Sequence, residues 1–333
     1  MLARVVTRLS IEILLRPGST GDAVRDVQRR LAALGHDTSP DTPGVYGEAT
    51  AAAVLAFQQR RGLREDGLCG PQTWSSLVEA GYHLGDRLLY LHQPMLRGDD
   101  VGELQRDLGA LGFDAGRVDA IFGPHTATAL TSFQRNAGIT TDGICGPDTI
   151  AALRRVVRVD SETTVAHVRE AESMRARRGV TGRRIAIGET GGLAALADAL
   201  GRALTDAGAV VVVLHHPDES VHAAEANAFE AEAYLGLDVV ETDAPKVAYY
   251  ATDRFVSFGG RHLANLVVEE LTALSSVDAS PPVGMRLPVL RETRMPAVLC
   301  EVGPPRSVVE RSGELVQALR RACNRWGSEP ADG

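Results

Sequence analysis

Residues 21–35 read GDAVRDVQRRLAALG and residues 98–112 read GDDVGELQRDLGALG, so one segment is written twice in this chain. In the first copy, apolar residues recur at three- and four-residue spacing, at Val24, Val27, Leu31 and Leu34. This spacing places them on one face of a helix. Asp is a suitable N-cap at the start of each segment, and the closing Gly is typical of a helix C-terminus. Each copy therefore predicts an amphipathic helix.

A second repeated segment completes each copy. Residues 66–73 read DGLCGPQT and residues 142–149 read DGICGPDT, and both predict a tight turn with Pro just before a short helix. A Phe-Gln pair marks another helix before each turn, at Phe57-Gln58 and Phe133-Gln134. We therefore predict two all-α modules of three short helices each, at residues 14–80 and 94–155.

These spaced motifs resemble the peptidoglycan-binding-domain-1 family, whose sequences carry the same helix, Phe-Gln and Asp-Gly-x-x-Gly signatures. The resemblance implies that each module binds peptidoglycan. Most motif positions are turn or core residues, so we expect them to build the fold. Ligand contacts are expected instead on exposed loops before the second helix of each module, at Tyr46, Asp119 and Phe122.

The second half of the chain alternates between short apolar runs and helical spacing. Strands are predicted at residues 184–188, 210–214, 237–240, 247–250 and 296–302, and helices at residues 193–206, 219–233 and 258–274. Such alternation is typical of an α/β domain with a mainly parallel sheet, here at residues 183–326. Residues 156–182 are predicted to be a linker that carries an exposed mixed-charge helix at residues 166–178.

The order of these elements resembles the amidase-3 family of zinc-dependent N-acetylmuramoyl-L-alanine amidases. The matching segments are Gly191-Gly192, Ala226-Asn227, Tyr249-Tyr250 and the run PAVLCEVG at residues 296–303. The resemblance implies an amidase-like α/β domain. In that family a zinc ion assists cleavage between the sugar lactyl group and the stem peptide.

The residues at the family's metal-ligand positions are unsuited to zinc. A hydrolytic zinc site needs three protein ligands and one open position for water. The resemblance places the two histidine positions at Thr190 and Val240, and the segment that should carry the third ligand is deleted. Glu301 stands at the acid/base position, but it is vestigial without a metal-bound water to activate. We therefore predict no metal and no cofactor, with zinc required only if the chain is an active amidase.

Other side chains are candidate replacements for the lost ligands. His215-His216 and His222 with Glu225 could chelate a metal, but we expect surface histidines at these positions. Cys300 lies next to Glu301 in a predicted strand, and we expect a buried cysteine that only packs. These residues do not predict a rebuilt catalytic site.

Composition and charge exclude several classes of protein. The net charge is -8 without a basic stripe, which argues against a nucleic-acid partner. The longest apolar run, residues 207–214, is too short to span a membrane. Residues 1–16 lack the continuous apolar region of a secretory signal. The four cysteines are widely separated, which fits a reducing compartment, so we expect a cytoplasmic protein.

Two binding modules followed by an amidase-like domain resemble the actinobacterial CwlM group. The runs AGYHLGDR at residues 80–87 and LRETRMP at residues 290–296 carry this resemblance. It implies a non-catalytic regulator of peptidoglycan synthesis, with peptidoglycan, muropeptide precursors and a cytoplasmic precursor enzyme such as MurA as partners. Two alternatives stay open, namely an active zinc-dependent amidase and a protein–protein scaffold.

Overall fold

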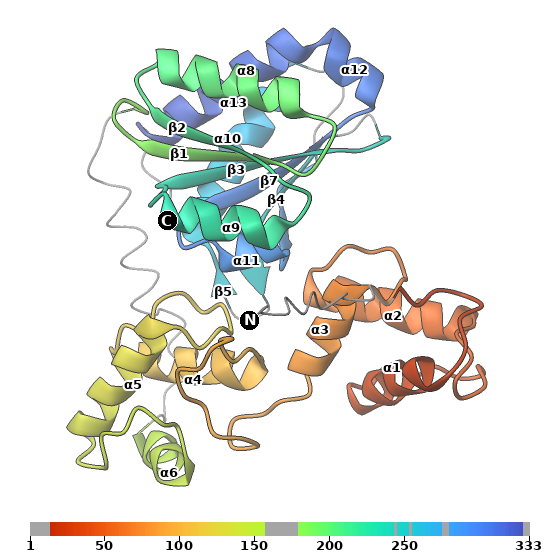
Figure 1. The fold of residues 1–333 in the computed structure, drawn as a ribbon, viewed down its shortest axis with the longest axis vertical. Coiled ribbons are helices and arrows are strands. Elements are labelled where there is room, and N and C mark those ends of the chain that lie inside the picture. The colour runs from red at the N-terminus through yellow and green to blue at the C-terminus, as the bar shows by residue number, and fades with distance from the viewer. Residues whose placement is uncertain (1–13, 157–178, 243–244, 253–254, 275–279, 329–333) are drawn as a thin grey trace, which may run out of the picture.

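The structure, a computed structural model, describes residues 14–156, 179–242, 245–252, 255–274 and 280–328. Two helical modules lie side by side next to one end of an α/β domain (Figure 1). This arrangement of all-α modules followed by an α/β domain is the one predicted from the sequence. The predicted linker helix at residues 166–178 lies outside the described residues.

Each module contains the three predicted helices. Module 1 is formed by α1 (Asp22–Ala33), α2 (Glu48–Arg61) and α3 (Pro71–Glu79). Module 2 is formed by α4 (Asp99–Ala110), α5 (Pro124–Asn136) and α6 (Pro147–Val156). The predicted apolar face is buried, and Val24, Val27 and Leu31 are all 0% exposed. Burial of this face holds the short helices together, because helices of this length are marginal on their own.

Buried glutamines explain the Phe-Gln signature of the repeat. In module 1, Gln58 Nε2 donates to Asp66 Oδ1 at 2.8 Å and to Thr73 Oγ1 at 3.0 Å. Its Oε1 accepts from the Gly67 amide at 2.8 Å. Gln134 makes the equivalent bonds in module 2. One amide group therefore fixes the Asp-Gly turn against the helix, so these motif residues build the module.

The α/β domain contains a sheet with the strand order β2-β1-β3-β7-β4-β5, and β6 pairs with β4. Its strands are β1 (Arg184–Glu189), β2 (Val210–His215), β3 (Ala233–Val239), β4 (Lys246–Thr252), β5 (Phe255–Val256), β6 (Val283–Met285) and β7 (Ala297–Val302). The neighbours from β2 to β7 are parallel, whereas β4 runs antiparallel to β7 and β5. The sheet is therefore mixed, with parallel pairing predominant.

Helices cover both faces of this sheet. One face packs against α8 (Ala194–Asp206), α10 (Phe258–Thr272) and α13 (Ser312–Trp326), with α12 (Pro305–Glu310) leading into α13. The other face packs against α9 (Glu219–Ala228) and α11 (Pro288–Glu292). Val118 of module 2 joins this second apolar cluster, so the face that carries α9 and α11 is the one turned toward the modules.

Two neighbouring boundaries in the α/β domain were predicted wrongly. The helix expected at residues 219–233 ends at Ala228, and Glu230 adopts a left-handed φ of 53°. Strand β3 then begins at Ala233 rather than at residue 237. Tyr234 and Leu235 are buried inside the sheet layer, and this packing outweighs the helical propensity of the preceding alanines.

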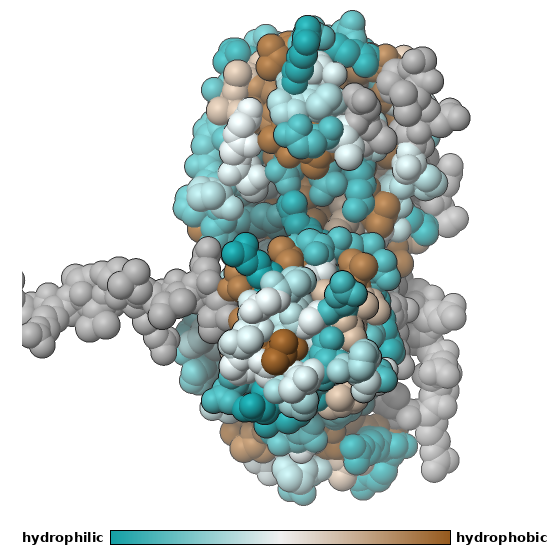
Figure 2. Space-filling view, turned by 90° about the vertical axis from the view of Figure 1, so that its right-hand side faces the viewer, coloured by the Kyte–Doolittle hydropathy of each residue, from teal (hydrophilic) through white to brown (hydrophobic). Residues whose placement is uncertain are grey.

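The exterior is mainly hydrophilic on the side viewed in Figure 2, with apolar residues scattered between polar ones. A scattered distribution is normal for the surface of a folded domain. None of the helices within the described ranges is both long and apolar enough to cross a membrane.

Candidate functional site

The carboxyl ends of β1, β3 and β7 meet at one edge of the sheet, where ligands commonly bind in open α/β folds. Thr190 follows β1, and its Oγ1 donates to Asp238 Oδ1 of β3 at 3.2 Å. The register sets Asp238 beside Glu301 of β7. Val240 follows β3, and its amide donates to the carbonyl of Val302 at 3.0 Å. Thr190, Val240 and Glu301 are thus gathered at this edge.

An arginine from module 1 reaches the same edge. Arg64 lies in the loop after α2, and its Nη2 donates to Asp238 Oδ2 at 2.7 Å and to Glu219 Oε1 at 3.3 Å. Burial opposes the charged form of Arg64, but the hydrogen bond to Asp238 and the charges of Asp238, Glu219 and Glu301 raise its pKa. Burial raises the pKa of Glu219, although the charge of Arg64 opposes this shift.

The guanidinium of Arg64 therefore supplies the positive charge for a group of carboxylates in another domain. The sequence offered no signal for this contact, because Arg64 and Asp238 are separated by 174 positions. Glu219, at the first position of α9, was missed for the same reason.

The side chains at this edge do not fit a hydrolytic zinc ion. The hydroxyl of Thr190 is engaged with Asp238, and Val240 offers no side-chain donor atom. Within the part of the chain that the structure describes, no three His, Cys, Asp or Glu side chains are grouped so as to hold a metal ion.

The candidate replacement ligands His215 and His222 have other partners. His215 Nδ1 contacts Glu189 Oε1 at 3.0 Å and Nε2 contacts Asp198 Oδ1 at 3.2 Å, and these hydrogen bonds raise its pKa. His215 is exposed, as expected, but the expectation is wrong for His222, which is fully buried. His222 Nδ1 contacts the Tyr234 hydroxyl at 3.0 Å, and burial lowers its pKa.

The cysteines are free thiols inside the domains. All four are buried, and Cys300 packs in the sheet core as expected. Burial raises the pKa of Cys69 to about 12 and shifts the pKa of Cys300 in the same direction. A thiol held in its neutral form is a poor nucleophile, so Cys300 adds no catalytic group beside Glu301.

The expectation of exposed ligand contacts is wrong for two of the three predicted residues. Tyr46 and Phe122 are both 0% exposed, because the loop before the second helix folds back over the module core. The Tyr46 hydroxyl donates to the carbonyl of Gly67 at 2.8 Å. Both side chains therefore pack inside their modules and present no surface to a ligand.

The third predicted residue, Asp119, holds its own loop in place. Its Oδ1 accepts from Gln105 Nε2 at 2.8 Å and from the Ile121 amide at 2.9 Å. Burial raises the pKa of this carboxyl. Its backbone carbonyl accepts from Arg291 Nε of the α/β domain at 2.6 Å, so the loop is part of a domain contact.

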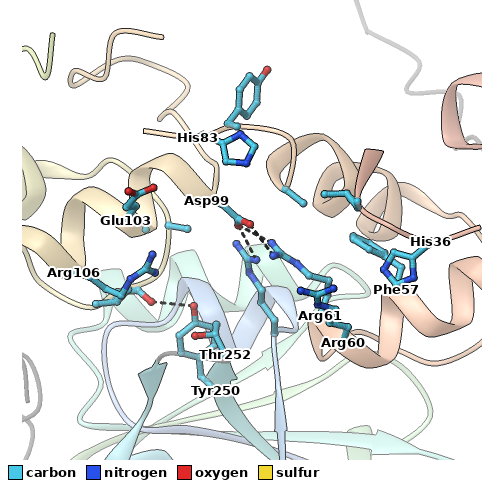
Figure 3. A pocket seen from close by; sticks show the side chains of 17 residues that line it. His36, Phe57, Arg60, Arg61, His83, Asp99, Glu103, Arg106, Tyr250 and Thr252 are labelled. Carbon is cyan, nitrogen blue, oxygen red and sulfur yellow. Dashed lines mark hydrogen bonds and ion pairs between the residues drawn. The ribbon is translucent and has the colours of Figure 1, made fainter. Parts of the chain in front are cut away.

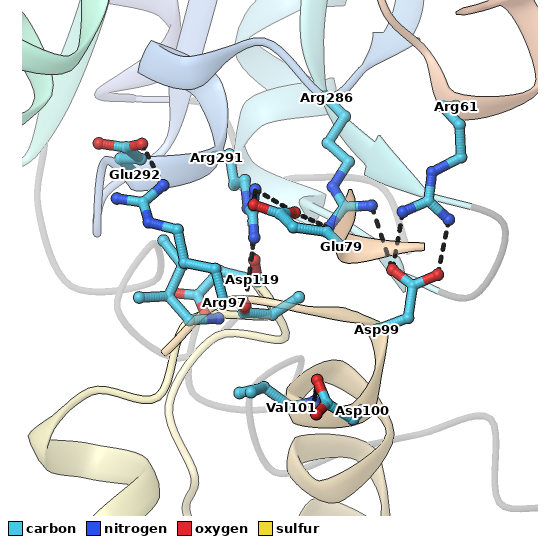
Figure 4. A network of polar contacts seen from close by, with 12 residues as sticks. Arg61, Glu79, Arg97, Asp99, Asp100, Val101, Asp119, Arg286, Arg291 and Glu292 are labelled. Atoms are coloured by element: carbon cyan, nitrogen blue, oxygen red, sulfur yellow. Dashed lines mark hydrogen bonds and ion pairs between the residues drawn. The ribbon is translucent and has the colours of Figure 1, made fainter. Parts of the chain in front are cut away.

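Figure 4 shows the network of charges to which this contact belongs. Glu79, at the end of α3, accepts from Arg291 Nη1 at 2.9 Å and from Arg286 Nη2 at 3.2 Å. Arg61 of module 1 forms two hydrogen bonds, of 2.7 and 2.8 Å, with Asp99 of module 2. Arg286 Nη1 lies 3.5 Å from Asp99. The three domains are therefore joined by one set of paired charges.

A groove of about 780 Å³ lies between module 2 and the α/β domain. The loop at residues 114–126 forms one side, and the other side includes Asn227, Phe255, Arg294 and Met295. Small-molecule sites commonly measure about 300–1,000 Å³ and combine apolar walls with a few polar groups. The groove matches this description, and it lies beside the predicted ligand loop.

Two segments of this chain match one known protein family. The family described as "Putative peptidoglycan binding domain" matches residues 20–77 and 97–153. N-acetylmuramoyl-L-alanine amidase CwlM of Mycobacterium tuberculosis is 34% identical over 331 residues, which cover 87% of this chain and 81% of the relative.

Further relatives match a smaller part of the chain. N-acetylmuramoyl-L-alanine amidase CwlL of Bacillus licheniformis is 32% identical over 166 residues, which cover 44% of this chain and 46% of CwlL. The solved structure of N-acetylmuramoyl-L-alanine amidase AmiC2 of Nostoc punctiforme covers 44% of this chain and 98% of its own, with 17% identity and a TM-score of 0.37.

These observations define a multidomain protein with two modules of the peptidoglycan-binding type and one α/β domain of the amidase type. The match to CwlM extends through most of both chains. The chain therefore belongs to the N-acetylmuramoyl-L-alanine amidase family.

Proposed function

We propose that this chain is a catalytically degenerate member of its family that binds peptidoglycan or its precursors and regulates wall synthesis in the cytoplasm. The observation that carries the proposal is the ion pair of Arg64 with Asp238 at the edge that also holds Glu301. Arg64 neutralises charge there without offering a Lewis acid, and Thr190 and Val240 are unsuited to hold one. Without a metal ion, Glu301 has no activated water to deprotonate.

Binding is the function that the remaining parts support. Both modules match the peptidoglycan-binding family along most of their length. The groove beside the loop at residues 114–126 has the volume of a ligand site and combines Arg117, Asn227 and Arg294 with apolar walls. We assign this groove to a sugar–peptide fragment of the wall or of a precursor.

Specific observations favour two other functions. Glu301 is retained, and the relatives carry amidase names, which favours an active N-acetylmuramoyl-L-alanine amidase. The resemblance to the CwlM group favours a scaffold that contacts a precursor enzyme such as MurA. The domain composition alone is compatible with both, so the experiment must separate them.

The test uses the purified full chain in three assays, which measure bound zinc, release of soluble fragments from peptidoglycan, and co-sedimentation with peptidoglycan. We expect no stoichiometric zinc, no release above the level of Glu301→Ala, and retention on the polymer. Stoichiometric zinc with hydrolysis that Glu301→Ala abolishes would establish the active amidase instead. Capture of MurA or another precursor enzyme, without any retention on peptidoglycan or muropeptides, would establish the scaffold.

A further inference from the structure

The two edges of the sheet in the α/β domain differ in length and in surroundings. At one edge, β5 and β6 span only two and three residues beside β4. Figure 3 shows Tyr250 and Thr252, at the end of β4, in a cavity that residues of both modules also line. The other edge is β2, and in the part of the chain that the structure describes β1 is the only strand paired with it. The outer side of β2 thus lies away from the modules (Figure 1).

This outer side presents backbone groups that can pair with another strand. The Val210 amide donates to the carbonyl of Arg183 at 2.8 Å, so the backbone groups of Val210 and of every second residue after it point toward β1. Val211 and Val213 consequently direct their amide and carbonyl groups outward. The six residues of β2 read VVVVLH and include no Lys, Pro or bulge, which are devices that commonly protect an edge strand. The strand is therefore suited to accept a further strand.

The helix beside this edge carries charges of both signs. An open hollow of about 360 Å³ lies along α8 and β2, and Asp198 and Arg202 line it on the helix. Arg202 is exposed, and its side chain forms no ion pair or hydrogen bond within the described ranges. Asp198 is 49% exposed and contacts His215 Nε2 at 3.2 Å. The hollow therefore offers a free cation and an accessible carboxylate one helical turn apart.

A two-fold axis through Val212 would join two copies of the chain at β2. In antiparallel pairing about such an axis, Val211 of one copy faces Val213 of the other. Each facing pair exchanges both of its backbone hydrogen bonds, so the outward groups of these residues all gain partners. Homo-oligomers most commonly form through such a contact, in which both copies use the same surface.

The same axis brings the two α8 helices together with opposite charges near each other. A Cβ added to Gly201 would lie 2.8 Å from Val213 Cγ2 and 3.8 Å from Val211 Cγ1, so Gly201 lies over the middle of β2 and next to the axis. About this point the two helices run antiparallel on the same face of the joined sheet. At a rise of about 1.5 Å per residue, Arg202 of one copy is offset by only about 3 Å along the helix from Asp198 of the other. This charge complementarity favours a second copy over an unrelated strand.

We propose that the chain forms a two-fold dimer through β2 and α8, in which the sheets of the two copies join into one. Strand pairing alone would bury little surface, whereas specific interfaces bury about 1,200–2,000 Å² in total, and the contact between the α8 helices adds to the buried area. The modules contact the opposite edge of the sheet, so the second copy does not compete with them there. A dimer would also carry twice as many modules, which increases the avidity for a polymer. Only this last consequence rests on the proposed function.

Sedimentation equilibrium of the full chain at low and high micromolar concentrations tests the dimer. We expect the wild type to shift from monomer to dimer as the concentration rises. Arg202→Glu places like charges next to Asp198 of the second copy and should raise the Kd of the dimer by about tenfold or more. The control Arg135→Glu reverses an exposed arginine on α5 and should associate like the wild type. The double variant Asp198→Arg/Arg202→Glu exchanges the two charges and should restore association.

Hydrogen exchange of the peptide that contains residues 210–215 tests where the copies meet. The outward amides of Val211 and Val213 should exchange more slowly at the high concentration in the wild type, because they are hydrogen-bonded only in the dimer. Arg202→Glu should remove this protection. Its thermal melting at low concentration should match that of the wild type, which separates loss of the contact from loss of the fold.

Three results would overturn the inference: a wild type that stays monomeric, a dimer in which the exchange of residues 210–215 is unchanged, or an equal loss of association in Arg202→Glu and Arg135→Glu. Slow exchange of residues 210–215 that does not depend on concentration would place another segment of this chain on β2. That outcome would overturn the inference as well.

Discussion

The two modules share one fold but contact the α/β domain through different faces. Module 2 docks through the loop before its second helix, where the carbonyls of Asp119 and Ala120 accept from Arg291. Module 1 docks through the segment after its second helix, where the Gly62 carbonyl accepts from the Arg286 amide at 2.6 Å and Arg64 reaches Asp238.

This difference shows which positions of the repeat are free to acquire new contacts. The glutamines that fix the turns are the same in both copies, with Gln28 in module 1 and Gln105 in module 2 each holding the loop before the second helix. The residues that dock are the ones outside that shared set, such as Arg64 and Glu79. The repeat therefore conserves its interior bonds while its two copies use different surfaces.

Replacing Glu79 by alanine tests the contact on which both docking faces depend, and it should have the largest effect. The side chains of Arg286 and Arg291 are only 7% and 9% exposed, so the variant leaves the buried guanidinium of Arg291 without its carboxylate and leaves Arg286 with only Asp99, at 3.5 Å. We expect a loss of about 3–5 kcal/mol in the free energy of unfolding, measured with urea. The control Glu48→Ala removes an exposed carboxylate and should cost less than about 1 kcal/mol. Equal losses in Glu79→Ala and Glu48→Ala would contradict the role of Glu79 as a contact shared by both docking faces.

Replacing Arg64 by alanine removes the docking contact that only module 1 makes, and it should have an intermediate effect. Arg64 is 42% exposed, so we expect a loss of about 1–2 kcal/mol near neutral pH. Arg29→Ala, which removes a 76% exposed arginine, is the control and should cost less than about 0.5 kcal/mol.

The loss in Arg64→Ala should also depend on pH. The pKa of Glu219 is raised in the folded chain, so the stability linked to this group is present at low pH and falls as pH rises through that pKa. Without Arg64 the pKa rises further. Urea unfolding should therefore show a larger loss at about pH 7 than at about pH 4.5. An equal loss of stability in Arg64→Ala at both pH values would exclude a role for the carboxylates that Arg64 contacts.

A reciprocal pair of substitutions compares the loops before the second helix of each module, of which only that of module 2 docks, and should have the smallest effects. Gly44 in module 1 has φ 86°, and its counterpart Ala120 in module 2 has φ 59°. Both are left-handed, which favours glycine. Gly44→Ala should cost about 1 kcal/mol, since its Cβ would also lie 3.3 Å from the Gly21 carbonyl. Ala120→Gly should gain at most about 0.5 kcal/mol, and thermal melting would measure both. A gain in Gly44→Ala would show that the loops differ in conformation.

The parts of the fold that depend on local pattern could be predicted from the sequence. The spacing at Val24, Val27 and Leu31 gave the module helices, because a helical face requires only neighbours in the chain. The β-branched runs predicted the strands of the sheet, because the residue pattern of a strand is also local in the chain. The end of α9 at Ala228 could not be predicted, because the burial of Tyr234 in the sheet decides it.

The candidate sites depend on contacts between distant segments, and this limited their prediction. Thr190, Val240 and Glu301 could be placed by resemblance, and they do lie at one edge of the sheet. Arg64 could not be placed at this edge from the sequence. Its contact with Asp238 forms only when module 1 packs against the α/β domain. Tyr46 and Phe122 were misjudged because an aromatic side chain in a polar loop can gain more by packing beneath the loop than by facing solvent.

The charge network around Glu79 has a consequence for cutting the chain into fragments. A fragment that ends after module 1 keeps the carboxylate of Glu79 and loses both of its guanidinium partners. The α/β domain alone would keep Arg286 and Arg291 as an unbalanced cationic surface. Such fragments would differ from the intact chain in solubility and in nonspecific attraction to acidic polymers. Affinities measured on them would therefore describe a newly exposed surface rather than the protein itself.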